Sequence, residues 1–242
     1  MTDDVSLFVR SYPNDFEWLK YSIRSMEKNL HGIDETVLVV PATKEDLPKE
    51  FKMFFDRIFF TQETHEGYVA QQIDKVKAYK YCTHENILFS DSDCIYYQPF
   101  GAGSLLTDDN KCILYRTRYS SLMVEDMPAH IQRTSVMRWK PITEQTTGID
   151  PDHEYMRCFP IMHKALTCHA LDSNPIYQRY IANLRDRSLS EFNALGVLAD
   201  KTELCKQYEL IDTESKLPEV TAKQYWSWGG ITTEIRSQLE TI

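Results

Sequence analysis

The 242-residue chain is 42% hydrophobic and 12% aromatic, so it can bury a substantial core, which excludes an intrinsically disordered protein. Its formal net charge of −9 argues against wholesale binding to nucleic acid. The charge is uneven, because residues 116–187 carry a net +2 while residues 1–115 carry −7 and residues 188–242 carry −4. The positive charge of residues 116–187 has two explanations, ordinary scatter of surface charge or contact with an anionic partner.

Targeting and membrane segments are not expected. The sequence opens Met1-Thr2-Asp3-Asp4 without a signal-peptide pattern, and no apolar run approaches the roughly 18 residues of a membrane span. Six scattered cysteines without a Cys-x-x-Cys pair predict free, buried thiols of a reducing compartment. We therefore expect a soluble, cytoplasmic protein, which for a viral chain means the cytoplasm of the host.

The first forty residues predict a strand, a helix and a second strand. Val5–Arg10 and Thr36–Val40 are apolar runs typical of buried strands, and Asn14 or Asp15 can cap the intervening helix. One buried helix stripe is expected from Phe16, Leu19, Ile23, Met26 and Leu30. This βαβ pattern places Arg10 and Ser11 at the carboxyl end of the first strand, where α/β sheets bind ligands.

A third strand, Arg57–Thr61, and a helix, Tyr68–Cys82, follow. Gln72 and Lys75 lie on adjoining turns of that helix, and a solvated helix face is the ordinary explanation for such a lysine. The sequence contains neither Gly-x-Gly-x-x-Gly nor Gly-x-x-x-x-Gly-Lys, and it has only 8 glycines. A bound phosphate would therefore depend on a metal ion instead of a glycine-rich loop.

The stretch Asp91-Ser92-Asp93 lies between two short apolar runs, Ile87–Phe89 and Ile95–Tyr97. Both runs predict buried strands, so the two carboxylates lie at the end of a sheet. On an extended chain the side chains of Asp91 and Asp93 share a face, and paired carboxylates suit Mg²⁺ or Mn²⁺. The alternative is a polar turn between two strands.

The middle of the chain is less regular. Cys112–Arg116 predicts a strand, but residues 117–155 show little periodicity and are expected to form a long irregular segment. Within it, Arg133, Arg138 and Trp139 combine positive charge with an aromatic face, which can hold sugars or bases by stacking. A loop with its own small core explains the same residues.

Helices are predicted again at Phe159–Leu171, Pro175–Arg187 and Ser190–Lys201, followed by a strand at Tyr208–Asp212. Ser188 or Ser190 can cap the third helix. Glu191 then stands in its first turn, where the helix dipole alone favours a carboxylate. In the tail, Gln224–Gly230, a strand would direct Trp226 and Trp228 to one side, as core or as the wall of a ligand site.

Taken in order, these segments resemble the nucleotide-sugar domain of the GT-A glycosyltransferases. The matching residues are Val5–Asp15, 67–79 with its Gln-x-x-Lys, and the hydrophobic-Asp-x-Asp-hydrophobic segment 87–97; residues 190–196 are similar to the Ser-Glu-Tyr helix start of bacterial and viral members. The resemblance covers about two thirds of the chain and leaves 117–155 unmatched. It implies an α/β fold with a mixed central sheet flanked by helices and an irregular and helical acceptor region.

The resemblance implies one compact domain with two halves. Residues 1–116 would be the nucleotide-sugar-binding βαβ half, and residues 117–242 the acceptor half with a closing C-terminal segment. Asp93 would bind Mn²⁺ or Mg²⁺ directly, and Asp91 would contact the donor ribose or a metal-bound water. The remaining donor-site residues would be Arg10, Ser11, Asp15, Gln72, Lys75, Ser92, Trp226, Trp228 and Gly229.

The implied reaction moves a sugar from a nucleoside-diphosphate sugar, with UDP the expected nucleotide, to an acceptor hydroxyl. Glu191 is the candidate catalytic base that deprotonates this hydroxyl, and His163 is the second candidate. Many members of the family add a metal-ligating histidine near the C-terminus, whereas the last histidine here is His169. A carboxylate such as Asp212 is one substitute, and closure of Tyr225–Gly230 without a ligand is the other.

The sequence leaves the identity of the acceptor undecided. A saccharide or small molecule is one option. A hydroxymethylated pyrimidine in viral DNA is another, with phosphate contacts from the arginines of 116–138 and 179–187. A non-catalytic nucleotide-sugar or nucleic-acid binding module of the same fold is the alternative to an enzyme. Phosphoryl transfer with Asp91 as nucleophile is disfavoured, because the second apolar run is not followed by the lysine and paired aspartates such chemistry requires.

Overall fold

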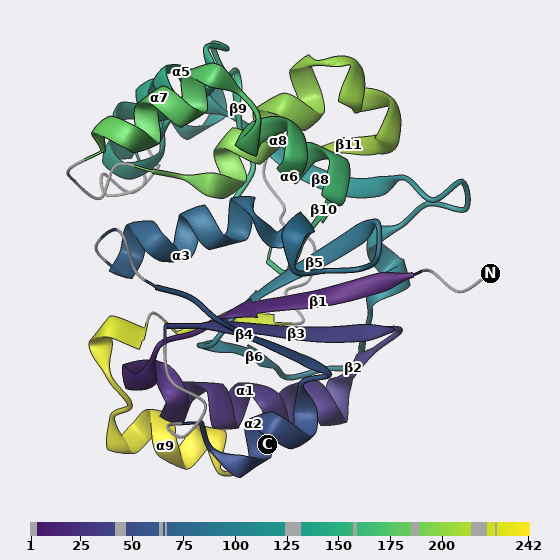
Figure 1. Cartoon of the computed structure of the whole chain (residues 1–242), viewed down its shortest axis with the longest axis vertical. Coiled ribbons are helices and arrows are strands. Elements are labelled where there is room, and N and C mark those ends of the chain that lie inside the picture. Colours follow the sequence, from purple (N-terminus) through teal and green to yellow (C-terminus); the bar gives the residue numbers. More distant parts are fainter. Residues whose placement is uncertain are drawn as a thin grey trace.

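The computed structural model describes residues 4–41, 47–62, 65, 67–123, 132–156, 159–184, 189–213, 222–225 and 227–242, without the side chains of 132–135 and 228. A five-stranded sheet forms the centre of the molecule (Figure 1). Its strands, in spatial order, are β10 (Ile161–Lys164), β5 (Asn86–Asp91), β1 (Val5–Arg10), β3 (Glu35–Val40) and β4 (Arg57–Phe60). Four strands run parallel and β10 pairs antiparallel with β5, so the predicted mixed α/β sheet flanked by helices is confirmed.

The central strands are buried along their whole length. Every residue of β1 and β5 is buried, and Val37–Val40 of β3 have no exposed surface. Continuous apolar runs suit this position, because helices cover both faces of the sheet. The strands predicted at Val5–Arg10 and Thr36–Val40 are therefore confirmed to within a residue.

One face of the sheet is covered by α1 (Phe16–Asn29) and α2 (Lys49–Phe54), with α9 (Thr233–Leu239) beside them (Figure 1). The predicted stripe of α1 directs Leu19, Ile23 and Met26 into the core, each with at most 4% of its surface exposed. The opposite face is covered by α3 (Gly67–Val76). This helix is shorter than the predicted Tyr68–Cys82, because the chain tightens into a separate 3₁₀ turn at Ala78–Lys80.

A second layer lies beyond α3 (Figure 1). Its helices are α5 (Lys140–Thr147), α6 (Ala165–Asp172), α7 (Pro175–Asn183) and α8 (Glu191–Lys201). Its small sheet has the order β11 (Tyr208–Asp212), β8 (Cys112–Arg118) and β9 (His153–Glu154). The helices predicted from Pro175 and from Ser190, and the strand at Tyr208–Asp212, are confirmed here.

The predicted helix Phe159–Leu171 is wrong in its first half. Ile161–Lys164 instead forms β10, which adds an edge strand to the central sheet opposite Asn86–Phe89. A short apolar run does not distinguish a strand from a buried helix turn, and here pairing with β5 decides. Because β10 comes from the second half of the chain, the sheet draws on both predicted halves.

The expected irregular segment at 117–155 is also wrong in part. Gln132–Trp139 forms a helical segment with π-type hydrogen bonds that runs directly into α5. Thr143, Thr146 and Thr147 are buried in α5, and each hydroxyl donates to the carbonyl four residues earlier. Because each hydroxyl forms its hydrogen bond with the backbone of its own helix, these polar residues can occupy the buried face. The buried face of the helix therefore lacks the apolar periodicity from which a helix is predicted.

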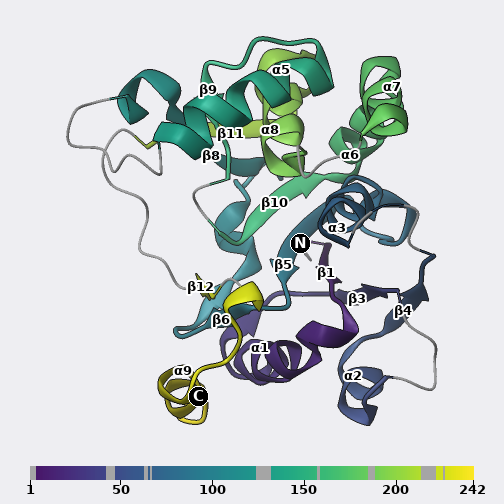
Figure 2. The same ribbon diagram turned by 90° about the vertical axis from the view of Figure 1, so that its left-hand side faces the viewer.

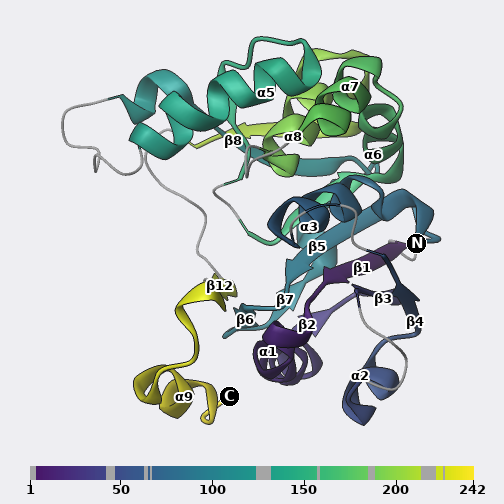
Figure 3. The same cartoon turned by 60° about the vertical axis from the view of Figure 1, so that its left-hand side comes forward.

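The C-terminal segment returns to the first half of the chain (Figure 3). β12 (Ala222–Gln224) pairs antiparallel with β6 (Cys94–Tyr96), the strand that follows Asp93. Leu239 of α9 packs with Trp18 and Tyr21 of α1 in a small separate core. A further two-stranded pair joins β2 (Leu30–His31) to β7 (Phe100–Gly101). The C-terminal segment is thereby held against the first half of the chain, through β12 at β6 and through α9 at α1.

No helix in the part of the chain that the structure describes is both long and apolar enough to cross a membrane. The five cysteines within that part are free thiols, of which Cys94, Cys112 and Cys168 are buried. Cys158 lies outside the described residues. The prediction of unpaired thiols is confirmed for the described cysteines.

Candidate functional site

A cavity of about 170 Å³ opens at the carboxyl edge of the central sheet, next to the end of β5. Figure 2 looks onto this edge. Four carboxylates line the cavity, from Asp15, Asp91, Asp93 and Glu191. Its other wall is apolar and aromatic, formed by Tyr68, Met156, Phe159 and Phe192. The cavity therefore combines an acidic floor, formed by Asp15, Asp91 and Asp93, with an apolar and aromatic wall.

The acidic floor follows from the way β5 ends. Its apolar residues Ile87–Phe89 have no exposed surface, and the strand stops at Asp91. Ser92 and Asp93 then form a turn into β6. Asp91, Ser92 and Asp93 are each at most 6% exposed and all line the cavity. The stretch is thus both a turn between two strands and the floor of a cavity.

Asp91 is surrounded by hydrogen-bond donors. Its Oδ1 lies 2.7 Å from the Lys75 Nζ and accepts a hydrogen bond from the Gln71 Nε2 at 3.1 Å. Its Oδ2 accepts from the Gln224 Nε2 at 3.0 Å. Both carboxylate oxygens are therefore satisfied by neighbouring side chains, and the side chain is held in one orientation.

Asp93 is left partly unsatisfied. Its Oδ2 accepts a hydrogen bond from the backbone N–H of Ser227 at 2.6 Å, whereas its buried Oδ1 has no partner among the described residues. Burial and the negative charge of Asp91 raise the pKa of Asp93 to about 6. Burial also raises the pKa of Asp15, and the charge of Asp91 adds to that effect. The acidic floor carries more negative charge than its protein partners offset.

This environment fits a divalent cation. The described residues contain no group of three or more histidine, cysteine, aspartate or glutamate side chains already arranged as a metal site. The orphaned, buried Oδ1 belongs to Asp93, which lines the same cavity as Asp91 and Asp15, and a carboxylate oxygen is nevertheless the type of ligand that Mg²⁺ or Mn²⁺ binds. Waters and a phosphate group normally complete the shell of such ions, so few protein ligands are needed.

Glu191 lines the same cavity as Asp91. Ser190 is the N-cap of α8, as predicted, although its side chain makes no capping hydrogen bond; the other candidate cap, Ser188, lies outside the described residues. The Glu191 Oε1 lies 2.9 Å from the Lys75 Nζ. Burial disfavours the ammonium ion of Lys75, but the charges of Asp91 and Glu191 outweigh it and raise the pKa of Lys75. Lys75 is therefore a buried cation between two carboxylates.

The structure brings seven of the predicted site residues into this one cavity. They are Asp15, Gln72, Lys75, Asp91, Ser92, Asp93 and Glu191. Sequence reasoning missed Tyr68, Gln71, Gln224 and Ser227, which also line it. Gln71 adjoins the Gln-x-x-Lys pattern and Gln224 opens the predicted tail. The sequence patterns therefore lay next to both residues, but they gave no sign that either side chain binds Asp91. Burial and the charge of Glu191 raise the pKa of Tyr68 to about 12, so its hydroxyl stays protonated.

Arg10 and Ser11 do not line this cavity. Arg10 has no exposed surface; its Nε donates to the Asp74 Oδ2 at 3.0 Å, and its guanidinium lies 3.9 Å from the centre of the Tyr12 ring. It lines a second cavity of about 240 Å³ on the same edge, together with Thr61 and Asp74. Ser11 is buried. The two predicted donor residues thus lie beside the acidic cavity and not in it.

His163 is corrected as a candidate base. It lies in β10, has no exposed surface and does not line the cavity. Its Nδ1 lies 3.3 Å from the Tyr208 hydroxyl, and burial lowers its pKa to about 3. A buried imidazole without access to a ligand cannot take a proton from an acceptor hydroxyl. The sequence offered only its residue type and not its burial.

The other predicted residues lie partly outside the described chain. Trp226 is outside it, as is the side chain of Trp228, while Gly229 is exposed and does not line the cavity. The predicted Trp-x-Trp strand is wrong for Ser227–Gly229, which forms a 3₁₀ turn. It is the backbone of this turn, through the N–H of Ser227, that reaches the acidic floor.

The predicted acceptor residues give a mixed result. The side chain of Arg133 lies outside the described residues. Trp139 is only 7% exposed, and the guanidinium carbon of Arg138 lies 4.5 Å from the centre of its ring. Trp139 is therefore a packed residue and not an open stacking surface. Arg138 is exposed, and its charge reaches Tyr68 at the cavity.

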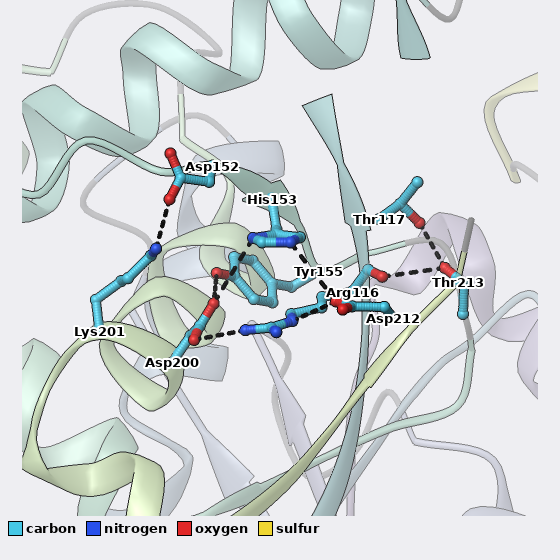
Figure 4. Close-up of polar contacts among 9 residues, drawn as sticks. All are labelled: Arg116, Thr117, Asp152, His153, Tyr155, Asp200, Lys201, Asp212 and Thr213. Carbon is cyan, nitrogen blue, oxygen red and sulfur yellow. Dashed lines mark hydrogen bonds and ion pairs between the residues drawn. The ribbon is translucent and has the colours of Figure 1, made fainter. Parts of the chain in front are cut away.

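Asp212, the suggested substitute metal ligand, belongs to a different cluster (Figure 4). Its Oδ1 accepts from the Arg116 Nε at 2.7 Å, and the Arg116 Nη1 donates to the Asp200 Oδ1 at the same distance. Asp212 does not line the acidic cavity. The pairing also occupies Arg116, which was one of the expected contacts to DNA phosphates.

Comparison with known proteins does not supply a family. No protein-family model matches the chain, and none of the curated proteins matches it in sequence. The function must therefore be argued from the geometry of the site.

Proposed function

We propose that this protein is a metal-dependent glycosyltransferase of the GT-A type that uses a nucleoside-diphosphate sugar. The observation that carries the proposal is the acidic cavity at the end of β5, with its unsatisfied Asp93 oxygen. Its position at the carboxyl edge of a mostly parallel sheet is where such folds bind nucleotides. The order of elements around it agrees with the resemblance that the sequence shows.

The charge of the cavity supports a metal requirement. Four carboxylates line it, and Lys75, the one cation among the described residues that line it, already contacts two of them. A diphosphate entering this cavity alone would meet net negative charge, which is unfavourable at these distances. A cation held by Asp93, and by Asp91 through a bound water, would neutralise both the carboxylates and the diphosphate.

The second cavity supports the placement of the nucleoside. It lies on the same sheet edge, and the Arg10 guanidinium, the Asp74 carboxylate and the Tyr81 ring line it. A base and ribose need aromatic and hydrogen-bonding contacts of this kind, whereas the transferred sugar and the diphosphate need the acidic cavity. The donor would then extend along the edge from Arg10 toward Asp93.

Glu191 is the proposed general base. It borders the cavity at the start of α8, and the aromatic wall of Tyr68, Phe159 and Phe192 lies beside it. Hydroxyl groups bind carboxylates, and the apolar faces of sugar rings pack on aromatic side chains. This wall favours a saccharide or a small uncharged acceptor.

DNA is the less favoured acceptor. Arg116 is engaged by Asp200 and Asp212, and Arg138 packs on Trp139, so two of the expected phosphate contacts serve other partners. The acidic cavity would also repel a phosphate backbone. Incorporation of labelled sugar into hydroxymethylated duplex DNA, but not into saccharides, would reverse this preference.

The first test is a thermal-shift screen of nucleoside diphosphates and their sugars, with and without Mn²⁺. A ligand present at about 100 times its dissociation constant should raise the melting temperature by about 5 °C. We expect a UDP species to give this shift only with Mn²⁺ or Mg²⁺. Absence of any metal-dependent shift with every nucleotide would contradict the proposal.

The second test separates an enzyme from a binding module of the same fold. With the donor and metal found in the screen, release of the nucleoside diphosphate is followed across saccharide and small-molecule acceptors. Turnover that is lost in Asp93→Asn but kept in Asp212→Asn supports the enzyme. Saturable binding without turnover for any acceptor supports the binding module instead.

A further inference from the structure

Helix α3 lies between the central sheet and the second layer of helices (Figure 1). It contacts β1 on one side and both α6 and α8 on the other. Lys75, in its last turn, is only 3% exposed, although a lysine at this spacing would ordinarily face solvent. The side chain is therefore built into the junction between the two layers.

The two partners of Lys75 come from opposite sides of that junction. Asp91 is the last residue of β5 in the central sheet, and Glu191 is the first residue of α8 in the second layer. The Lys75 Nζ lies 2.7 Å from the Asp91 Oδ1 and 2.9 Å from the Glu191 Oε1. One ammonium group thereby joins residues that are 100 positions apart in the chain.

The surroundings hold the ammonium in this place. The Phe192 ring centre lies 4.7 Å from the Lys75 Nζ, and the side chains of Lys75, Asp91 and Glu191 are each at most 9% exposed. A lysine has three N–H donors, of which two are directed at these carboxylates. To bind a phosphate, Lys75 would have to leave two buried carboxylates without their counter-charge, which is costly.

We propose that Lys75 is a positioning residue that clamps Glu191 to Asp91 at the edge of the cavity and does not bind the donor diphosphate. The clamp sets the separation between the acidic floor and the proposed base. Its catalytic consequence rests on the proposed function, since it acts through Glu191, whereas the charge clamp itself does not depend on which reaction the cavity performs.

A stability cycle tests the clamp without any substrate. Lys75→Met should lower the melting temperature by about 10 °C, because Asp91 and Glu191 lose their shared cation. Glu191→Gln should lower it in the wild-type background but raise it in the Lys75→Met background, where it removes an uncompensated charge. Lys52→Met, at an exposed helix position, is the control and should change it by less than about 2 °C.

The sign reversal is the decisive result, because a lysine that only filled space would not produce it. If Glu191→Gln lowers the melting temperature equally in both backgrounds, the two charges are not coupled and the proposal is overturned. If Lys75→Met does not fold, Lys75→Gln with and without Glu191→Gln gives the same comparison with a milder loss.

Kinetics distinguish the clamp from a donor-binding lysine. Lys75→Met should lower kcat by about 100-fold, the effect of a misplaced base, while the donor KM changes by less than about threefold. Lys75→Arg should restore part of kcat, because a guanidinium can also bridge two carboxylates. A large rise in the donor KM with kcat unchanged would identify a phosphate ligand and overturn the proposal. A wild-type protein without turnover would contradict the proposed function alone, and the stability cycle would then decide the clamp.

Discussion

Two polar clusters in this molecule, one buried and one partly exposed, have the same arrangement of charges and are balanced differently. At the edge of the central sheet, Lys75 lies between Asp91 and Glu191. In the second layer, Arg116 lies between Asp200 and Asp212 (Figure 4). Each cluster thus consists of a basic side chain bridging two carboxylates from different elements, yet only the first borders the acidic cavity.

The two clusters differ in how much carboxylate charge their neighbours leave without a counter-charge. Around Arg116, Lys201 also pairs with Asp152, the Tyr155 hydroxyl donates to Asp200, and the hydrogen bond from Arg116 lowers the pKa of Asp212. At the sheet edge the pKa of Asp93 is raised by burial and by its neighbour Asp91. Neutralised carboxylates stabilise a fold, whereas carboxylates with raised pKa around a cavity mark a binding site. The predictions below test this contrast.

The largest effect is expected from Asp93→Asn. Loss of the negative charge of Asp93, which lines the cavity, should reduce turnover by on the order of 1,000-fold and remove the Mn²⁺-dependent thermal shift. The fold should persist, since Asn can still accept the hydrogen bond from Ser227. Nucleoside diphosphate release and circular dichroism measure the two properties. Near wild-type turnover in a folded variant would show that the site is misplaced.

Glu191→Gln should have the next largest effect. Without a base at this position, kcat should fall by about 100-fold. Binding of Mn²⁺, followed by isothermal titration calorimetry, should stay within about threefold of the wild type, because the proposed cation ligand is Asp93 and the proposed role of Glu191 is that of the base. Equal losses of metal binding and turnover would place Glu191 among the metal ligands instead.

A substitution in the Arg116 cluster should change the stability of the protein and not its activity. Arg116→Met leaves Asp200 and Asp212 without their shared cation and should lower the free energy of unfolding by about 2 kcal/mol, discounted because Asp212 is partly exposed. Turnover per folded molecule should change by less than about twofold. Chemical denaturation and initial rates measure the two properties. A loss of activity comparable to that of Glu191→Gln would contradict the prediction and show that the Arg116 cluster also contributes to activity.

The smallest effect concerns pH. His163 has a folded pKa of about 3, far below its value in the unfolded chain, so the folded state disfavours the protonated ring. Its contribution to stability is present above pH 6.5 and is lost as the pH falls. Between pH 6.5 and 5.5 the loss should be about 1 kcal/mol, because the unfolded histidine is about half protonated at the start of this interval.

His163→Gln should flatten this part of the stability curve, measured by urea denaturation at each pH. His31→Gln, at an exposed position, should leave it unchanged and serves as the control. An unchanged pH dependence in His163→Gln would show that another group causes the acid destabilisation.

Much of the fold could be predicted because its signals are local. The apolar runs of β1, β3 and β5 and the periodic stripe of α1 carry their own pattern. β10 and α5 could not be predicted in this way. The strand character of Ile161–Lys164 comes from pairing with β5, and the buried threonines of α5 carry no apolar pattern.

The residues of the candidate site likewise divide into those that local sequence signals predicted and those that they did not. The end of an apolar strand marked Asp91 and Asp93, and a helix start marked Glu191. The sequence ranked Glu191 before His163 as the base, but it did not show that the sheet buries His163 and that Glu191 borders the cavity. Burial depends on which elements pack together, and a residue type does not contain that information.

The sequence by itself determined the mostly parallel α/β sheet and the presence of two carboxylates at one strand end, because strand periodicity and strand termini are local properties. Only the tertiary structure decided which charges meet. It brought Lys75, Gln224 and Glu191 to Asp91 from three distant segments, and it left one oxygen of Asp93 without a hydrogen-bond partner among the described residues. Electrostatic balance is a property of distances in space, and those distances are set when the layers pack.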